Sequence, residues 1–395
     1  MVQTRTFDGS AGTGAAVTKA DPQGEEALNT VVVTGATGFV GGHTLQALAD
    51  GPWEVIAACR DPARLPPGFS GEVMAGDLRD SAYCRALANR ADGLIHAAAW
   101  SSLYGHQRRS ARLFREPSLS LIEEARRGRV SRFVFVSSTG AARPGQGTDA
   151  NQAGRVTGFW PHLDNVVTIE EALREAAQDG LDRCVSMRLG LFVGENYGLG
   201  LLPILVPRLK TRLVPWVAGG RTPLPLIDGE DIGRALRAAL ETPLPSGYQG
   251  FNAVGPTVPT AREVITFLHE EFDLPKPWFS VPFCVAHPFA AAMEALSRVT
   301  PWDPLVSRAI IHLLRDFKVD NDKAKQMLGY DPHMDWRGAI RRQMAEMADR
   351  QKQPMRMIKV SRASGPAGPV GHKRSDQAQD PGGLPPTSVL PFSER

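Results

Sequence analysis

The sequence predicts a doubly wound α/β fold, in which helices cover both faces of a parallel β-sheet. Six short apolar runs, rich in β-branched residues, alternate with helical patterns between residues 30 and 189. A glycine-rich turn follows the first run, and beyond about residue 194 prolines and helical patterns replace the alternation. Continuous apolar runs are typical of strands buried on both faces, and their alternation with helices implies right-handed crossovers in a parallel sheet.

The predicted elements follow in order along the chain. Strands are predicted at 30–34, 54–59, 72–75, 93–97, 132–137 and 183–189, with intervening helices at 41–49, 119–127 and 168–177. A smaller, mostly helical lobe comes next, with helices at 231–240, 260–271, 288–298, 304–314 and 335–347. Asp231 is expected to cap the first of these later helices, because a carboxylate accepts hydrogen bonds from first-turn N–H groups.

The chain of 395 residues is expected to hold a sheet domain at 29–194 and a smaller lobe at 195–350 that is interleaved with the last strands. Residues 1–28 lack periodicity, and 351–395 are rich in glycine, proline, serine and charge. Such segments bury too little apolar surface to offset the entropy of ordering them. Both ends are therefore predicted to be disordered.

Composition excludes several classes of function. The net charge of +3 gives no field that would make nucleic acid the main partner. The four cysteines lie far apart, so we expect neither a disulfide framework nor a metal site. The most apolar late stretch, 281–296, is too short and too polar to span a bilayer. We expect a cytoplasmic protein with a small-molecule substrate; the basic run 208–212 leaves a peripheral membrane contact open, and a homodimer is also left open.

The strongest motif is the glycine-rich turn in VVVTGATGFVG, which follows the first predicted strand. Gly35 permits the tight turn, Gly38 lets the backbone approach a pyrophosphate, and Gly41 allows close packing of the helix on the strand. The following helix offers free N–H groups and the positive end of its dipole to phosphates. The motif therefore predicts a dinucleotide-binding site.

Further motifs identify a family resemblance. TGATGFVG, GDLRD at 76–80, HAAA at 96–99, VSSTG at 136–140 and MRLGLFVGEN at 187–196 resemble the extended short-chain dehydrogenase/reductase family, also called the NAD-dependent epimerase/dehydratase family. The segment FKVDNDKAKQMLGYDP at 317–332 resembles the 3β-hydroxysteroid dehydrogenase-like branch. The resemblance covers about residues 30–350 and implies a Rossmann-type fold and an NAD(P)-dependent oxidoreductase.

The resemblance also implies which residues hold the cofactor. It assigns the pyrophosphate to the turn residues Gly35, Thr37, Gly38, Phe39, Val40 and Gly41. It assigns the adenine to Asp77 and Leu78 at the end of the third strand, and a close contact with the cofactor to Ala97, Ala98 and Ala99 at the end of the fourth. Asp77 could instead be a solvated turn carboxylate. At the end of the second strand Arg60 favours NADP over NAD, because a guanidinium binds a 2′-phosphate. In the alternative, Arg60 is a surface residue and Asp61 binds the ribose of NAD.

The sequence departs from this family at the catalytic residues. The family uses a Ser or Thr after the fifth strand, where Ser138 and Thr139 stand, together with a Tyr-x-x-x-Lys pair on the next helix. We expect Thr139 to hold the substrate oxygen, with Ser138 close by. Between Gly140 and Arg188 there is neither a tyrosine nor a lysine. On the helix predicted at 161–176, the family pattern places His162 at the tyrosine, Asn165 near the serine and Val166 at the lysine; a shift of one residue gives Leu163 and Val167.

Three explanations for the missing pair stay open. His162 could transfer the proton, because imidazole titrates near neutrality, or it could be a surface histidine without a catalytic role. Tyr104 or Tyr197 could reach the site from a loop. The chain could also bind the cofactor as a sensor or scaffold without turnover, or act as an epimerase or dehydratase with altered acid–base residues.

The predicted function is an NAD(P)-dependent oxidoreductase acting on a carbonyl or alcohol of a small or mid-sized apolar substrate. Aromatic residues of the second lobe support this substrate character, although the same side chains could be core: Trp216, Trp278, Phe279, Phe283 and Phe289. Tyr104, Arg188 and Asn196 are expected to border the substrate. Arg188 could equally pair with a core carboxylate.

Overall fold

The computed structural model describes residues 4–6, 28–128, 130–145, 149–196, 200–297, 299–300, 304 and 306–352. Residues 1–352 form one compact unit. Most of the two ends predicted to be disordered lie outside the described residues. Within the N-terminal end, however, Thr4–Thr6 form strand β1, which pairs in parallel with β4. An edge strand presents unpaired N–H and C=O groups, which explains why this short segment finds a partner there.

The main sheet has eight parallel strands in the order β1-β4-β3-β2-β5-β6-β7-β11. Their bounds after β1 are β2 Thr30–Thr34, β3 Glu54–Cys59, β4 Glu72–Ala75, β5 Gly93–His96, β6 Arg132–Ser138, β7 Arg183–Leu189 and β11 Gly247–Ala253. From β2 the chain runs outward through β3 to β4, then returns to the other side of β2 and runs through β5 to β11. The carboxyl ends of β2 and β5 therefore form the switch point, where such sheets bind their ligands.

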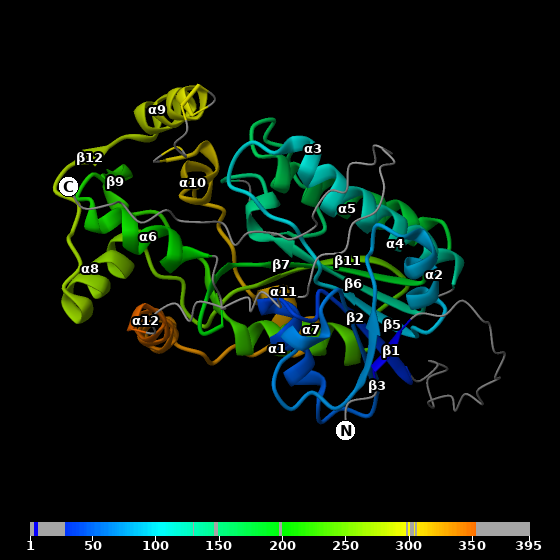
Figure 1. The fold of residues 1–395 in the computed structure, drawn as a ribbon. Coiled ribbons are helices and arrows are strands. Elements are labelled where there is room, and N and C mark those ends of the chain that lie inside the picture. The colour runs from blue at the N-terminus through cyan, green and yellow to red at the C-terminus, as the bar shows by residue number, and fades with distance from the viewer. Residues whose placement is uncertain are drawn as a thin grey trace, which may run out of the picture. The chain divides into compact units, whose positions relative to one another are not determined.

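Helices cover both faces of this sheet (Figure 1). One face packs against α1 (Phe39–Leu48), α7 (Gly229–Glu241) and α11 (Asp322–Leu328). The other packs against α2 (Ser81–Ala88), α4 (Glu116–Arg127) and α5 (Pro161–Gln178). Along β2, Val31 and Val33 face the first layer and Val32 the second, and all three are fully buried. The doubly wound α/β prediction is confirmed.

The second lobe combines helices with two small parallel strand pairs. β8 (Leu191–Val193) pairs with β10 (Leu226–Asp228), and β9 (Trp216–Val217) pairs with β12 (Ser280–Val281). The helices are α6 Leu201–Lys210, α8 Ala261–Phe272, α9 Phe283–Leu296, α10 Arg308–Leu313 and α12 Trp336–Lys352. Among the described residues, no helix is both long and apolar enough to cross a bilayer.

The structure also contains elements that the sequence did not predict. Strand β11 reads GYQGFNA, and its glycines and polar residues interrupt the apolar run that marks a buried strand. A Cβ at Gly250 would lie 2.0 Å from the carbonyl oxygen of Ala150, so close chain packing requires glycine there. Helices α6 and α11 were missed as well; α6 carries a proline, Pro207, in its interior.

Several predicted boundaries were wrong, and two of them bear on the site. The fourth strand ends at His96, one residue early. The N-cap of α7 is Asp228, which accepts a hydrogen bond from the Glu230 N–H, and not Asp231. Asp231 lies in the first turn of α7, fully buried, and accepts hydrogen bonds from the N–H groups of His333 and Met334. The carboxylate therefore anchors the segment before α12 and does not cap its own helix.

Candidate active site

The glycine-rich turn joins β2 to α1 with almost no free space. Gly35 has a φ of 68°, and a Cβ there would lie 2.6 Å from the Ala98 nitrogen at the end of β5. A Cβ at Gly41 would lie 2.2 Å from the Gly35 carbonyl oxygen. Side chains at either position would push the turn, the helix and the neighbouring strand apart. The sequence prediction that these glycines allow a tight turn and close helix packing is confirmed.

The N-terminus of α1 suits an anionic group. Its N-cap is Gly38, an exposed glycine, and no side chain caps the helix. Thr37 is partly buried beside it, while the side chains of Phe39 and Val40 point into the core. The first-turn backbone and the positive end of the helix dipole therefore face outward, which fits the pyrophosphate of a dinucleotide.

A buried hydrogen-bond chain fixes the ends of β2 and β5 next to this turn. The Nδ1 of His96 lies 2.7 Å from the Thr34 hydroxyl, and its Nε2 lies 2.8 Å from the Ser118 hydroxyl. Ser118 donates its proton to the carbonyl of Phe114, so it accepts from His96 Nε2–H, and Thr34 donates to Nδ1. Burial lowers the pKa of His96 to about 4, which keeps the ring neutral.

The next residues, Ala97 to Ala99, are partly or fully exposed beyond this anchor. Their small side chains leave room for a cofactor, as the resemblance implies. The sequence analysis named His96 only as part of the HAAA motif. A histidine within an apolar strand is the signal that could have identified His96 as the residue that anchors two strand ends.

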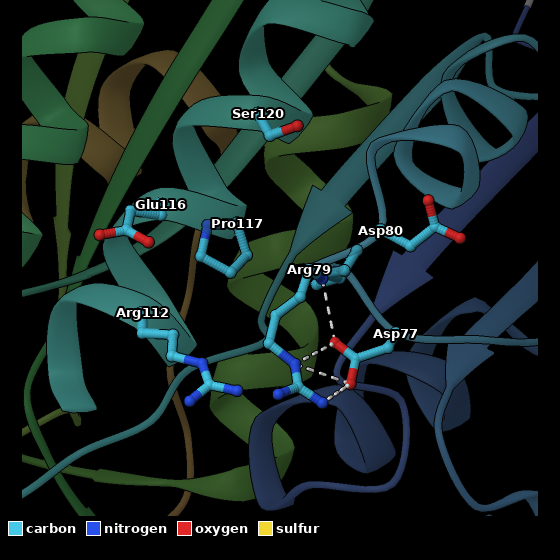
Figure 2. Close-up of a pocket in the computed structure, with 8 residues that line it drawn as sticks. Asp77, Arg79, Asp80, Arg112, Glu116, Pro117 and Ser120 are labelled. Carbon is cyan, nitrogen blue, oxygen red and sulfur yellow. Dashed lines mark hydrogen bonds and ion pairs between the residues drawn. The ribbon is translucent and has the colours of Figure 1, made fainter. Parts of the chain in front are cut away.

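The loop after β4 forms one wall of a pocket of about 530 Å³. Asp77, Leu78, Arg79 and Asp80 come from this loop, and the opposite wall comes from the π-helical turn Ala111–Arg115 and from α4. Figure 2 shows Arg79 bound to Asp77, with Arg112 reaching into the pocket from the opposite wall. This pocket therefore lies where the resemblance expects the adenine end of the cofactor.

The Asp77 carboxylate is already engaged in this pocket. Arg79 donates to it from Nε at 3.0 and 3.1 Å and from Nη2 at 2.7 Å, and its backbone N–H adds a bond of 2.9 Å. The hydrogen bonds from Arg79 lower the pKa of Asp77, and the charge of Arg60 adds to this effect. Asp77 is thus an ion-pair partner as well as a pocket residue, an arrangement that the sequence analysis did not consider.

The two cofactor interpretations rest on the residues that follow β3. Arg60 is exposed and makes no ion pair with another described residue, while its charge acts on Asp77 nearby. The carboxylate of Asp61 accepts a hydrogen bond from the Ala63 N–H and caps the short 3₁₀ helix Pro62–Arg64. The carboxylate is committed to the backbone, whereas the guanidinium is available to an anion.

At the end of β6, Ser138 and Thr139 enter the 3₁₀ turn Thr139–Ala141. The Ser138 side chain is partly exposed, and its Oγ accepts a hydrogen bond from the Gly140 N–H at 3.2 Å, so its own proton stays free to be donated. Thr139 is only 3% exposed. Of the two predicted hydroxyls, Ser138 is therefore the more accessible to a substrate.

His162 lies at the start of α5 and contacts the loop that follows Ala97–Ala99. Its Nδ1 lies 3.1 Å from the carbonyl oxygen of Trp100, and its ring lies 5.2 Å from that of Phe114. Trp160 ties down the same loop by donating from Nε1 to the carbonyl of Ser102 at 2.7 Å. The structure thus brings His162 to the cofactor loop across 62 residues of sequence.

The protonation state of His162 follows from these contacts. Burial lowers its pKa to about 4, which outweighs the opposing effect of the Trp100 carbonyl. A carbonyl oxygen only accepts, so in the neutral ring the proton sits on Nδ1 and Nε2 carries a lone pair. Near neutral pH the free nitrogen of His162 is therefore a proton acceptor.

The lysine position of the family is part of the core in both registers considered. Val166 is 3% exposed and Val167 is 1% exposed, and Leu163 is fully buried. Asn165 is buried too and donates from Nδ2 to the Ser110 hydroxyl at 2.8 Å, which fixes α5 to the segment before the π-helical turn. The side chains that the resemblance aligns with the family lysine therefore pack in the core.

The substrate assignment of Arg188 was wrong. Its guanidinium is 2% exposed and binds the fully buried Glu170 through Nε at 2.9 Å and Nη2 at 2.6 Å. Nη2 also donates to the carbonyl of Gln152. The alternative pairing with a core carboxylate is the one observed, because a buried charge near the carboxyl end of β7 needs a buried partner.

The other expected substrate residues lie on loops. Tyr104 is partly buried after β5, where its carbonyl accepts a hydrogen bond from Ser102. Asn196 is exposed after β8, with a φ of 63°, and its N–H donates to Glu346 of α12. Tyr197 lies outside the described residues. None of the described contacts brings Tyr104 or Asn196 to Ser138 or His162.

The sequence analysis missed a second histidine at this site. His312 of α10 is 7% exposed and donates from Nε2 to the carbonyl of Gly140 at 3.0 Å. Burial is the main cause that lowers its pKa. His312 thereby holds the turn that carries Ser138 and Thr139 from the side of the second lobe. A contact across 172 residues leaves no local signal in the sequence. Among the described residues, no cluster of His, Cys, Asp or Glu could hold a metal ion.

Known proteins share these features. The model of the NAD dependent epimerase/dehydratase family matches residues 31–252. A 3β-hydroxysteroid dehydrogenase/Δ5→4-isomerase of Mycobacterium tuberculosis is 34% identical over 127 residues, which cover 30% of this chain and 34% of the relative. A ceramide reductase of Caulobacter vibrioides is 33% identical over 124 residues, which cover 30% of this chain and 38% of the relative. The chain thus spans little more than a third of either relative.

A solved structure of UDP-glucose 4-epimerase from Thermotoga maritima shares the fold. The TM-score is 0.62 at 18% identity, and the match covers 82% of this chain and 99% of that chain. The family model alone covers more than half of the chain. Together with the glycine turn and the doubly wound sheet, this establishes that the chain belongs to the NAD-dependent epimerase/dehydratase family.

Proposed function

We propose that this chain is an NAD(P)-dependent oxidoreductase that interconverts an alcohol and a carbonyl on an apolar, mid-sized organic substrate. The observation that carries the proposal is the contact of His162, which the resemblance aligns with the family tyrosine, with the loop beyond Ala97–Ala99. The names of two relatives, which specify a hydroxysteroid and a ceramide, support the substrate class. Both molecules are largely apolar and carry a hydroxyl or keto group.

NADP(H) is the proposed cofactor. Arg60 is an exposed cation at the strand end that sets this preference in Rossmann folds, and Asp61 is committed to capping. Calorimetric titration of the chain with NADP⁺ and NAD⁺ tests this. We expect tighter binding of NADP⁺, and loss of the preference in Arg60→Ala. Equal affinities for the two cofactors in the unmodified chain would contradict the role of Arg60.

In the proposed mechanism, the bound nicotinamide supplies or accepts the hydride. Ser138 donates a hydrogen bond to the substrate oxygen, because its proton is free and its side chain is partly exposed. In alcohol oxidation, Nε2 of His162 accepts the hydroxyl proton, and in carbonyl reduction the imidazolium returns it. Thr139 fixes the turn from its buried position.

The pKa of His162 sets the expected pH dependence. Because the pKa is lowered to about 4, the ring is almost entirely neutral at pH 7. Oxidation therefore needs no deprotonation step and should be flat between about pH 6 and 8. Reduction needs the rare imidazolium, so its rate should fall about tenfold per pH unit above the pKa.

The experiment measures formation and consumption of NADPH with a panel of hydroxysteroids, long-chain ketones and small polar carbonyls as controls. We expect turnover on the apolar compounds, and His162→Phe should lower the rate by about 10²–10⁴-fold and abolish the pH dependence of reduction. His269→Phe is a matched control, because His269 Nδ1 also lies close to a backbone carbonyl, that of Leu274 at 2.8 Å, but in α8. An unchanged pH profile in His162→Phe would refute the mechanism.

A dinucleotide-binding protein without turnover is the second candidate. It is favoured by one observation, the replacement of the family lysine by buried valine. Cofactor binding without consumption on every compound in the panel would select it over the oxidoreductase.

A further inference from the structure

Helix α9 exposes an unusual set of side chains. All of its exposed residues are uncharged and mostly apolar, and we call them the outer face of α9: Cys284, Val285, Pro288, Phe289, Ala292, Ala295 and Leu296. Val285 is 53% exposed, Phe289 52% and Leu296 51%. Their spacing of three and four residues places them on one side of the helix. A surface helix of a water-soluble lobe normally presents charged residues on that side.

The helix is nevertheless fixed in this orientation. Its one carboxylate, Glu294, is 6% exposed and binds Arg308 of α10 through the backbone N–H at 2.7 Å and Nε at 2.8 Å. Ala286 and Ala290 on the inner side pack against Ile311. The charge therefore points inward and the apolar side chains point outward. Rotating α9 to hide the outer face would break the ion pair with Arg308.

The apolar surface continues on both sides of α9 in the sequence. Trp278, five residues before the helix, is 79% exposed, and Val299 after it is 82% exposed. The indole Nε1 of Trp278 donates to the carbonyl of Arg212, which places the ring beside Leu213, itself 61% exposed. These exposed apolar side chains belong to α9 and to the segments before and after it, and exposed apolar side chains on neighbouring segments mark a site that contacts another apolar phase or molecule.

The exposed charges that flank Trp278 and Leu213 are mostly basic, with Asp273 as an exposed carboxylate in the same stretch. Lys210, Arg212 and Lys276 are exposed, and none forms an ion pair with another described residue. Tryptophan and basic residues beside an apolar helix face are typical of helices that lie in a membrane interface, where anionic headgroups attract the cations.

We propose that the outer face of α9, together with Trp278, docks onto the surface of an anionic lipid bilayer. With 14 residues the helix is roughly 21 Å long, which suits insertion parallel to the surface to the depth of the headgroup boundary. Lys210, Arg212 and Lys276 contact the headgroups.

The docking face is connected to the candidate active site. The ring of His287 on α9 lies 5.4 Å from that of Phe159, which precedes α5 and His162, and Arg308 stacks on the same ring at 4.9 Å. His312 of α10 holds Gly140. If the proposed function holds, this arrangement lets an apolar substrate pass from the bilayer to the site. The docking itself does not depend on turnover.

The test is co-sedimentation of the full chain with sucrose-loaded vesicles, without cofactor or substrate. One set is pure phosphatidylcholine and the other contains 30% phosphatidylglycerol. We expect binding to the anionic vesicles to be at least tenfold stronger, and Phe289→Glu with Leu296→Glu to weaken it by at least tenfold. Val258→Glu is the control, because Val258 is exposed outside this surface, at 37%. Lys210→Glu with Arg212→Glu should weaken binding to anionic vesicles about fivefold per residue and leave binding to neutral vesicles unchanged.

Light scattering in the absence of lipid tests whether the outer face of α9 instead binds a second copy of this chain. The five substituted side chains are exposed, so the variants are expected to keep the thermal unfolding profile of the unmodified chain. If the unmodified chain does not bind either vesicle, or if Phe289→Glu with Leu296→Glu converts an oligomer to a monomer, a bilayer is not the partner. Vesicle binding by a chain that proves inactive would retain this inference while the proposed function fails.

Discussion

The ion pair between Glu170 and Arg188 is predicted to support the fold and not substrate binding. Glu170 is fully buried and accepts four hydrogen bonds, from Ser137 at 2.6 Å, Ser186 at 2.8 Å and Arg188 at 2.9 and 2.6 Å. These bonds tie α5 to β6 and β7. A buried charge that loses its partner costs about 3–5 kcal/mol, a large share of a total stability of about 5–15 kcal/mol.

Two single variants and one double variant measure this contribution. Arg188→Met leaves the carboxylate without its cation, and Glu170→Gln leaves the guanidinium without its anion and turns an amide toward three donors. Each should lower the free energy of unfolding by about 3–5 kcal/mol. In Glu170→Gln with Arg188→Met no charge stays buried, so the loss should be smaller than the sum of the two single losses by at least about 2 kcal/mol.

Urea unfolding followed by circular dichroism and tryptophan fluorescence gives these free energies. At urea concentrations below the unfolding transition, the Arg188→Met molecules that stay folded should have the same KM as the unmodified chain. The reasoning is refuted if the free energy of unfolding of Arg188→Met lies within about 1 kcal/mol of that of the unmodified chain while its KM rises more than tenfold. That outcome would return Arg188 to the substrate site.

Two further predictions concern the turns at the site. Gly41→Ala places a Cβ 2.2 Å from the Gly35 oxygen and should weaken cofactor binding roughly tenfold to a hundredfold in calorimetry, whereas Gly42→Ala, whose Cβ meets only a proline ring at 3.4 Å, should bind normally. His312→Phe leaves the Gly140 carbonyl without a donor and should lower the free energy of unfolding by about 1–3 kcal/mol. It should also lower kcat by a larger factor than it changes KM, and His312→Asn should restore part of the stability and part of kcat. Equal effects at Gly41 and Gly42, or a change confined to KM in His312→Phe, would contradict these arguments.

Much of the fold was predictable because its signals are local. Val31 to Val33 read as a strand buried on both faces, and Gly35 and Gly41 stand where only glycine fits. The missed strand β11 shows the limit of this signal. It lies at the edge of the sheet and carries glycine at position 250 because another chain segment approaches there, which no periodicity reveals.

The candidate site was predictable where the family motif is continuous in sequence. It was not predictable where contacts join residues that are far apart in sequence. The glycine-rich turn was located by its spacing and by its position after the first predicted strand. His96 and His312 act through partners 22 to 172 residues away, so their roles became visible only in three dimensions. Arg188 illustrates the opposite error, since its place in a motif suggested exposure to substrate although its charge is buried.

Two departures from the family's catalytic pattern, histidine aligned with the tyrosine and valine aligned with the lysine, are consistent with one another in the proposed mechanism. A tyrosine with a pKa near 10 needs a neighbouring cation to lower that value toward neutrality, and the family lysine provides it. An imidazole needs no such help, and burial has already taken the pKa of His162 to about 4. A cation beside it would lower the pKa further and make the imidazolium needed for carbonyl reduction rarer still. With histidine at the first position, a lysine at the second has no pKa to adjust, and Val166 instead contributes its side chain to the core under α5.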